Sequence, residues 1–191
     1  MSTVVVVRKN GIAAIAADTL TTFGNIKESA EYIVNHEKII SYKAGFLGVS
    51  GSANLHIGVS SFLSKTRKVF DLTSVNSIYD FGLALHNELK EKHFLKGDDE
   101  ESFETFHGDI LLANSSGIFG LSSYRYVQEY SKFYANGSGG DFALGSLYSN
   151  YPNPELGAEQ IAVKAVEAGC EFDDGSGKPI MSFSLKLKKQ K

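Results

Sequence analysis

The first residues of the chain combine the groups that nucleophilic catalysis needs. Ser2 follows Met1, and an initiator methionine is usually removed when the second residue is small. Ser2 would then carry a hydroxyl and a free α-amine on one residue. An α-amine has an ordinary pKa of about 7.7–8.0 and can accept a proton at neutral pH, whereas a lysine amine at about 10.4 cannot without a large shift. We therefore expect Ser2 to provide both nucleophile and base.

Other familiar sites fit the sequence less well. The stretch "GSGGDFALG" has Phe142 at the third glycine position of a dinucleotide-binding loop, and "GVSGS" ends in Ser52 where a serine-hydrolase turn needs glycine. The histidines form no H-E-x-x-H motif, and Cys170 has no second cysteine, so we expect no metal and no cofactor. We interpret Cys170 as a small buried residue at a helix end, and every histidine as a surface or satisfied core residue. The histidines are His36, His56, His86, His93 and His107.

A predicted hairpin positions Ser2. The β-branched run "STVVVVRK" predicts a strand, the Asn10-Gly11 pair predicts a tight turn, and "IAAIAAD" predicts a second strand that ends on Asp18. Because the first strand is continuously apolar rather than alternating, we expect other layers to cover both of its faces.

The remaining patterns alternate between strands and helix pairs. The order is strands, a helix pair, strands, a helix pair and a last strand, which predicts two sheets face to face with helices outside each. No linker or repeat divides the chain, so we expect one domain over residues 1–191. The expected strands are in "EKIISYKAGFLGVSG", "GDILLAN", "IFGLSS", "KFYANGSGGD" and "DDGSGKPIMSFSLKL". The expected helices cover residues from about 53 to 70, "SIYDFGLALHNEL", "FALGSLYSN" and "ELGAEQIAVKAVEAG". We expect "TLTTFGN" to form a polar turn and "LKGDDEESFE" to form an exposed acidic loop.

Composition excludes several classes of partner. The formal net charge of the 191 residues is −3, which gives no basic field for nucleic acid or for anionic lipid. No apolar run approaches the length of a membrane span, and the start lacks the basic leading region of a signal peptide. A single cysteine also argues against a disulfide-stapled secreted domain, so we expect a cytoplasmic protein.

Several stretches of the sequence resemble those of a known family. The stretches "TVVVVRKNGIAAIAADTLTTFGN", "EKII", "GFLGVSGSA", "NGSGGD" and "DDGSG" are similar, in this order and over nearly the whole chain, to proteasome β-subunits and HslV-type peptidases. The similarity is greatest to the bacterial proteasome-β homologues. It implies an α+β fold, a four-layer αββα sandwich of the N-terminal nucleophile hydrolase type, and a threonine-type peptidase that hydrolyses polypeptides inside a homo-oligomeric double ring.

The resemblance also implies a role for individual residues. Ser2 stands where the family has its threonine nucleophile, Lys38 at the catalytic lysine, and Asp18 at the aspartate that orients this lysine. Gly51 matches the glycine whose backbone N–H stabilises the oxyanion. The residues that match the cluster positioning the terminal amine are Ser138, Asp173 and Ser176, and those at the substrate-pairing backbone are Thr22 and Ala53. The chain departs from the family in having Ser2 for threonine, Leu20 for a frequent arginine, and a longer stretch between Asp18 and Lys38.

Two alternatives to a ring-shaped peptidase stay open. One is a catalytically silent ring subunit that serves as a scaffold, and the other is an N-terminal nucleophile hydrolase of a small amide. The joint presence of Asp18, Lys38 and Gly51 favours catalysis over the scaffold. The chain carries no ATPase signature, so any unfolding of protein substrates requires a separate ATPase or unfoldase partner.

Overall fold

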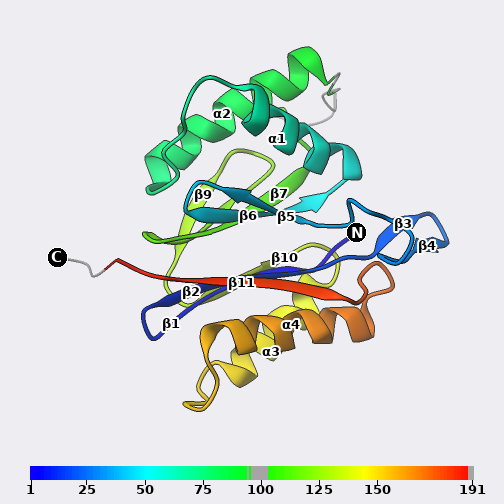
Figure 1. Ribbon diagram of the computed structural model, residues 1–191, viewed down its shortest axis with the longest axis vertical. Coiled ribbons are helices and arrows are strands. Elements are labelled where there is room, and N and C mark those ends of the chain that lie inside the picture. Colours follow the sequence, from blue (N-terminus) through cyan, green and yellow to red (C-terminus); the bar gives the residue numbers. More distant parts are fainter. Residues whose placement is uncertain (94, 96–102, 189–191) are drawn as a thin grey trace.

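The structure is a computed structural model that describes residues 1–93, 95 and 103–188. It has four layers (Figure 1): helices α1 (Ala53–Lys65) and α2 (Val75–Lys92) cover one sheet, and helices α3 (Gly140–Asn150) and α4 (Ala158–Phe172) cover the other. The predicted αββα architecture is therefore confirmed. Among the described residues, no helix has the length and apolar character that crossing a bilayer requires.

The sheets are antiparallel throughout. The five-stranded sheet has the order β5-β6-β7-β8-β9, and the four-stranded sheet has the order β10-β1-β2-β11. Their bounds are β5 (Ile39–Tyr42), β6 (Gly45–Gly51), β7 (Gly108–Asn114), β8 (Gly117–Leu121) and β9 (Val127–Tyr130), and then β10 (Phe133–Asn136), β1 (Val4–Lys9), β2 (Ile12–Asp18) and β11 (Ile180–Lys186).

Strand β1 is buried on both faces, as its four valines predict. Val4 and Val6 belong to the apolar core between the two sheets, whereas Val5 and Val7 belong to the core between the four-stranded sheet and helices α3 and α4. All four have no exposed surface. Ser2 and Thr3 are thereby attached to a strand that packs against other layers on both faces.

The turn between β1 and β2 has the conformation that its sequence predicts. Asn10 and Gly11 both have positive φ angles, 52° and 73°. Two central residues with positive φ are typical of the type I′ turn that joins two-residue hairpins. This turn sets a register in which Val4 lies opposite Ala17 and Val7 opposite Ala14.

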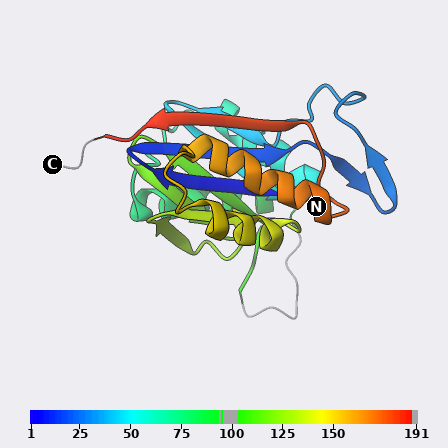
Figure 2. The same ribbon diagram turned by 90° about the horizontal axis from the view of Figure 1, so that it is seen from below.

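The stretch "TLTTFGN" differs from the plain turn that we expected. It forms a small hairpin of β3 (Thr21–Phe23) and β4 (Ile26–Glu28) that projects from the body of the molecule, as Figure 2 shows. No residue from Thr21 to Lys38 is buried, so the apolar periodicity used to recognise strands is absent from this arm.

Several further element boundaries differ from the sequence predictions. Helix α1 ends at Lys65 rather than near residue 70, and α4 begins at Ala158 rather than at Glu155. Strand β9 was not predicted, because its pattern "VQEY" has one buried residue only. Most of the predicted acidic loop "LKGDDEESFE" lies outside the described residues.

Candidate active site

The lysine and the aspartate predicted for catalysis form an ion pair. Lys38 Nζ lies 2.8 Å from Asp18 Oδ1 and 2.9 Å from Oδ2. The side chain of Asp18 has no exposed surface, and that of Lys38 is 12% exposed. The longer stretch between the two residues is accommodated in the β3–β4 arm and the loop after it, so it does not separate them.

Backbone donors complete the environment of the Asp18 carboxylate. Oδ1 accepts a hydrogen bond from the Thr3 amide at 2.9 Å, and Oδ2 accepts bonds from the amides of Leu20 and Gly177, both at 3.1 Å. A buried carboxylate is stable only when its oxygens are paired in this way. Asp18 therefore holds Lys38 and also ties the start of β1 to the segment that precedes β11.

A second polar cluster surrounds the backbone nitrogen of Ser2. This nitrogen donates to Ser138 Oγ at 3.2 Å, and Ser138 Oγ donates to Asp173 Oδ2 at 2.8 Å. Ser176 Oγ donates to the same Asp173 oxygen at 2.6 Å and lies 2.7 Å from Thr3 Oγ1. The three residues predicted to position the terminal amine thus form one connected network at the nitrogen of Ser2.

The hydroxyl of Ser2 and the ammonium of Lys38 meet at the carbonyl of Met1. Ser2 is 3% exposed, and its Oγ donates to the Met1 oxygen at 2.5 Å. Lys38 Nζ donates to the same oxygen at 3.4 Å. With Met1 attached, the nitrogen of Ser2 is an amide and cannot act as a base.

A pocket of about 400 Å³ adjoins Ser2. Gly51, Thr22 and Ala53 line it, so the residues predicted to bind substrate share one cavity with the predicted nucleophile. Gly51 has a φ of 135°, and a Cβ there would lie 2.8 Å from the His107 carbonyl oxygen. Only glycine fits this position, at the end of β6 and immediately before the N-cap of α1.

Every predicted site residue therefore belongs to the Lys38–Asp18 ion pair, to the network at the nitrogen of Ser2, or to the pocket wall. Their catalytic roles stay predictions. Sequence reasoning missed three participants. Thr3 contributes its amide to Asp18 and its hydroxyl to Ser176. Glu37 and His56 line the pocket. The sequence signal for Glu37 was its position next to Lys38, whereas His56 gave none beyond its place near Gly51.

His56 does not have the satisfied environment that we expected for the histidines. Its Nε2 is buried and has no hydrogen-bond partner among the described residues. Burial lowers the pKa of His56, the charge of Lys38 lowers it further, and the charge of Glu37 acts in the opposite direction. The imidazole is thus held in its neutral form.

Other chemistry at this site has less support. Burial raises the pKa of Cys170 to about 11, which keeps its thiol protonated and unreactive. Within the described ranges, no group of three or more His, Cys, Asp and Glu side chains is placed to hold a metal ion.

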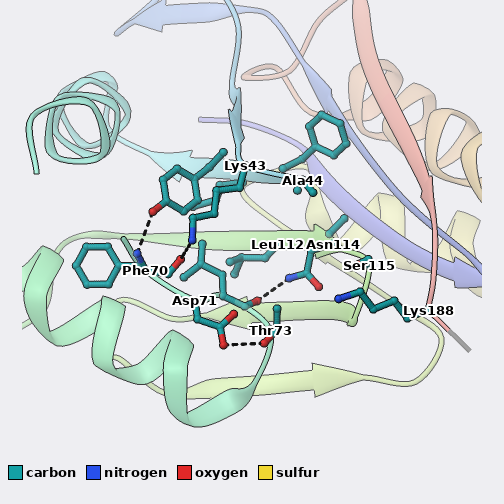
Figure 3. A pocket seen from close by; sticks show the side chains of 15 residues that line it. Lys43, Ala44, Phe70, Asp71, Thr73, Leu112, Asn114, Ser115 and Lys188 are labelled. Atoms are coloured by element: carbon teal, nitrogen blue, oxygen red, sulfur yellow. Dashed lines mark hydrogen bonds between the residues drawn. The ribbon is translucent and has the colours of Figure 1, made fainter. Parts of the chain in front are cut away.

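A second cavity lies at the other end of the five-stranded sheet (Figure 3). Its volume is about 170 Å³, and none of the predicted site residues lines it. Its polar groups bind the protein itself: Lys43 Nζ donates to the Phe70 carbonyl at 2.9 Å, and Asn114 Nδ2 donates to the Leu72 carbonyl at 2.6 Å. The cavity beside Ser2 is the better candidate for an active site.

Comparisons with known proteins identify relatives of the whole chain. No family model matches the chain. It is 24% identical to the proteasome subunit beta of Nanoarchaeum equitans (strain Kin4-M), over 98% of this chain and 94% of that protein. The structure of Thiobacillus denitrificans BPH is 44% identical, with a TM-score of 0.95 over 98% of this chain and 100% of that one.

Two further solved structures are similar. The complex of Thiobacillus denitrificans BPH with epoxomicin is also 44% identical, with a TM-score of 0.92, and covers 97% of this chain and 99% of that one. The HslV of Trypanosoma brucei has a TM-score of 0.72 at 19% identity, over 96% of this chain and 99% of that one. The likeness to this HslV is one of fold alone.

Proposed function

Because this chain belongs to the family of proteasome β-subunits and HslV-type peptidases, we propose that it is an N-terminal nucleophile peptidase that uses Ser2 after Met1 has been removed. The observation that carries the proposal is the carbonyl of Met1, which accepts hydrogen bonds from both Ser2 Oγ and Lys38 Nζ. Nucleophile and cation thus converge on one carbonyl group, in the place that a substrate carbonyl needs to occupy.

The proposed reaction has two halves. Ser2 Oγ attacks the substrate carbonyl carbon while the free α-amine of Ser2 takes its proton, and the leaving amine receives that proton as the peptide bond breaks. An ester between Ser2 and the acyl fragment remains. Water then attacks the ester, with the amine again as the base, and releases the acid and the free hydroxyl.

The surrounding groups have separate tasks in this mechanism. The positive charge of Lys38, fixed by Asp18, favours the ionised hydroxyl of the nucleophile. The backbone N–H of Gly51 stabilises the oxyanion, and helix α1, which begins two residues later at Ala53, adds the positive end of its dipole. Ser138, Asp173 and Ser176 hold the amine in place.

Substrate is proposed to bind as an extended strand. Thr22 and Ala53 both line the pocket, one in β3 and one at the start of α1. Backbone groups from two separate elements favour an extended peptide, because its own N–H and C=O groups alternate in direction. Polypeptides are therefore the proposed substrate class.

The first test is cleavage of unstructured peptides. Purified protein that lacks Met1 is expected to hydrolyse them, with products identified by mass spectrometry, and epoxomicin is expected to inhibit the reaction because it forms a complex with the BPH that is 44% identical. Release of ammonia or an amine from small amides, with no peptide cleaved, would favour the small-amide hydrolase. Absence of all hydrolysis would favour the scaffold.

We also propose that the chain forms a closed double ring of identical subunits. The projecting arm and the exposed faces of helices α1 to α4 give each subunit different contact surfaces, and heterologous contacts that close produce rings. Light scattering is expected to give a mass many times the 20.7 kDa of one chain. A mass of one or two chains at micromolar concentration would contradict the ring. A separate ATPase partner and a cytoplasmic location stay predictions.

A further inference from the structure

The charges around the pocket beside Ser2 do not cancel. The ammonium of Lys38 is paired with the carboxylate of Asp18. Glu28 and Glu37 also line the pocket, and neither carboxylate forms an ion pair within the described residues. The uncompensated charge at this pocket is therefore negative.

His56 leaves this negative charge in place. It is close enough to Glu37 for their charges to interact, so a protonated imidazole would cancel that carboxylate. Burial of His56 and the nearby ammonium of Lys38 keep the imidazole neutral instead. The other residues with titratable groups that line the pocket are His36, Glu28 and Met1, which carries the α-amine of the chain start.

The nitrogen Nε2 of His56, which has no partner among the described residues, is available to bind a ligand in the pocket. A buried polar atom without a hydrogen bond destabilises the folded protein, and native proteins retain few such atoms. The described residues give His56 Nε2 no partner, and the residue lines the pocket that substrate must enter. A neutral imidazole nitrogen with a free lone pair accepts a hydrogen bond from an N–H group.

The apolar residues of the pocket wall can pack against the methylene groups of a long basic side chain. Val49 is 4% exposed, and Ile33 and Ile57 lie at the wall as well. Aliphatic side chains of this kind bind the methylene groups of lysine and arginine, whose charged ends then reach polar partners. Apolar walls with carboxylates and one nitrogen acceptor match a cation on an aliphatic chain.

We propose that this pocket selects peptides with lysine or arginine immediately before the cleaved bond, through the carboxylate of Glu37 and the unpartnered Nε2 of His56. The inference rests on the proposed peptidase function, because only the residue whose carbonyl carbon lies at Ser2 Oγ places its side chain beside Ser2 and Gly51. Glu37 binds the ammonium or guanidinium by charge-assisted hydrogen bonds, and His56 Nε2 accepts a further N–H. Glu28 adds its negative charge from the β3–β4 arm.

The test uses four fluorogenic peptide amides that differ only in the residue before the amide: Arg, Gln, Leu or Glu. For the parent protein without Met1, kcat/KM is expected to be about ten-fold higher for Arg than for Leu, the ratio that one good charged contact of about 1.4 kcal/mol gives. Glu37→Gln should remove most of this ratio, and His56→Leu should lower it. Glu31→Gln is the matched control, since Glu31 is an exposed glutamate of the same loop that does not line the pocket.

A binding measurement separates this inference from the peptidase mechanism. Calorimetry with the matching product peptides, which end in Arg or Leu, needs no turnover and is expected to show tighter binding of the Arg peptide. Efficient cleavage after Leu with no preference for Arg would overturn the selectivity and leave the peptidase standing. An unchanged Arg-to-Leu ratio in Glu37→Gln would also overturn it. If no peptide is cleaved but the Arg peptide binds more tightly, the pocket's selectivity stands and the peptidase mechanism fails.

Discussion

Ser2→Ala protein is expected to fold and assemble like the parent and to cleave no peptide at a measurable rate. The substitution removes one hydroxyl from a residue that the network around Asp18 and Ser138 otherwise holds through its backbone and its neighbours. Loss of this hydroxyl removes the oxygen that forms the ester intermediate of the proposed reaction. Fluorogenic peptides and light scattering measure activity and assembly on the same samples.

Retention of a residue before Ser2 is the complementary experiment. Protein with a non-removable residue at this position should assemble and should also be inactive, because the Ser2 nitrogen is then an amide rather than an amine. Intact mass of active parent protein should show the loss of one methionine. Ser2→Thr is the conservative variant and should be active, since threonine keeps the hydroxyl and restricts χ1. Cleavage by Ser2→Ala, or by homogeneous protein that still carries Met1, would contradict the mechanism.

Lys38→Ala is expected to lower kcat/KM for peptide cleavage by about 10²–10⁴-fold. The reason is the loss of the ammonium that hydrogen-bonds to the carbonyl beside Ser2 Oγ. Peptide cleavage measured with the best parent substrate checks the effect. Full activity in this variant would show that another group performs the role assigned to Lys38.

Stability needs a separate control at this position. Removal of Lys38 leaves the buried Asp18 carboxylate without its cation, and a broken buried pair costs about 3–5 kcal/mol. Lys38→Arg keeps a positive charge beside Asp18 and is the stability-matched variant. It should unfold in denaturant near the parent midpoint yet lose activity, because a guanidinium does not place a single ammonium at the reacting carbonyl.

Local patterns in the sequence predicted the arrangement of strands and helices, whereas the membership of the site came from the resemblance. The valine run, the Asn10-Gly11 turn and Asp18 specify a hairpin whose ends are fixed, and the resemblance supplied the partners from distant segments. No local pattern indicates that Lys38 returns to Asp18 across a longer arm. That contact was predicted by similarity and appears in the structure at 2.8 Å.

The features that sequence reasoning missed depend on long-range burial. The β3–β4 arm has no buried residue, so its strands lack the apolar alternation that marks a strand. His56 is one residue of an ordinary amphipathic helix, and only the fold places its Nε2 in the wall of a pocket without a partner. Charge balance within a cavity is likewise a property of several segments together, and no single stretch of sequence contains it.

The uniform valines of β1 have a consequence for how accurately the chain can place its own end. A slip of one residue against β2 would keep valine at three of the four buried positions and bring Thr3 or Arg8 to the fourth, so the valines themselves provide little resistance to it. Such a slip would move Ser2 by about 3.3 Å, the rise of one strand residue, which is enough to separate its hydroxyl from Lys38. The alignment is therefore enforced at the strand's two ends, by the Asn10-Gly11 turn and by the bond from the Thr3 amide to Asp18. The length of this turn sets the register of β1 against β2 and thereby the position of the Ser2 hydroxyl at the other end of the strand. We therefore expect the proposed activity to depend on a turn that lies far from the pocket.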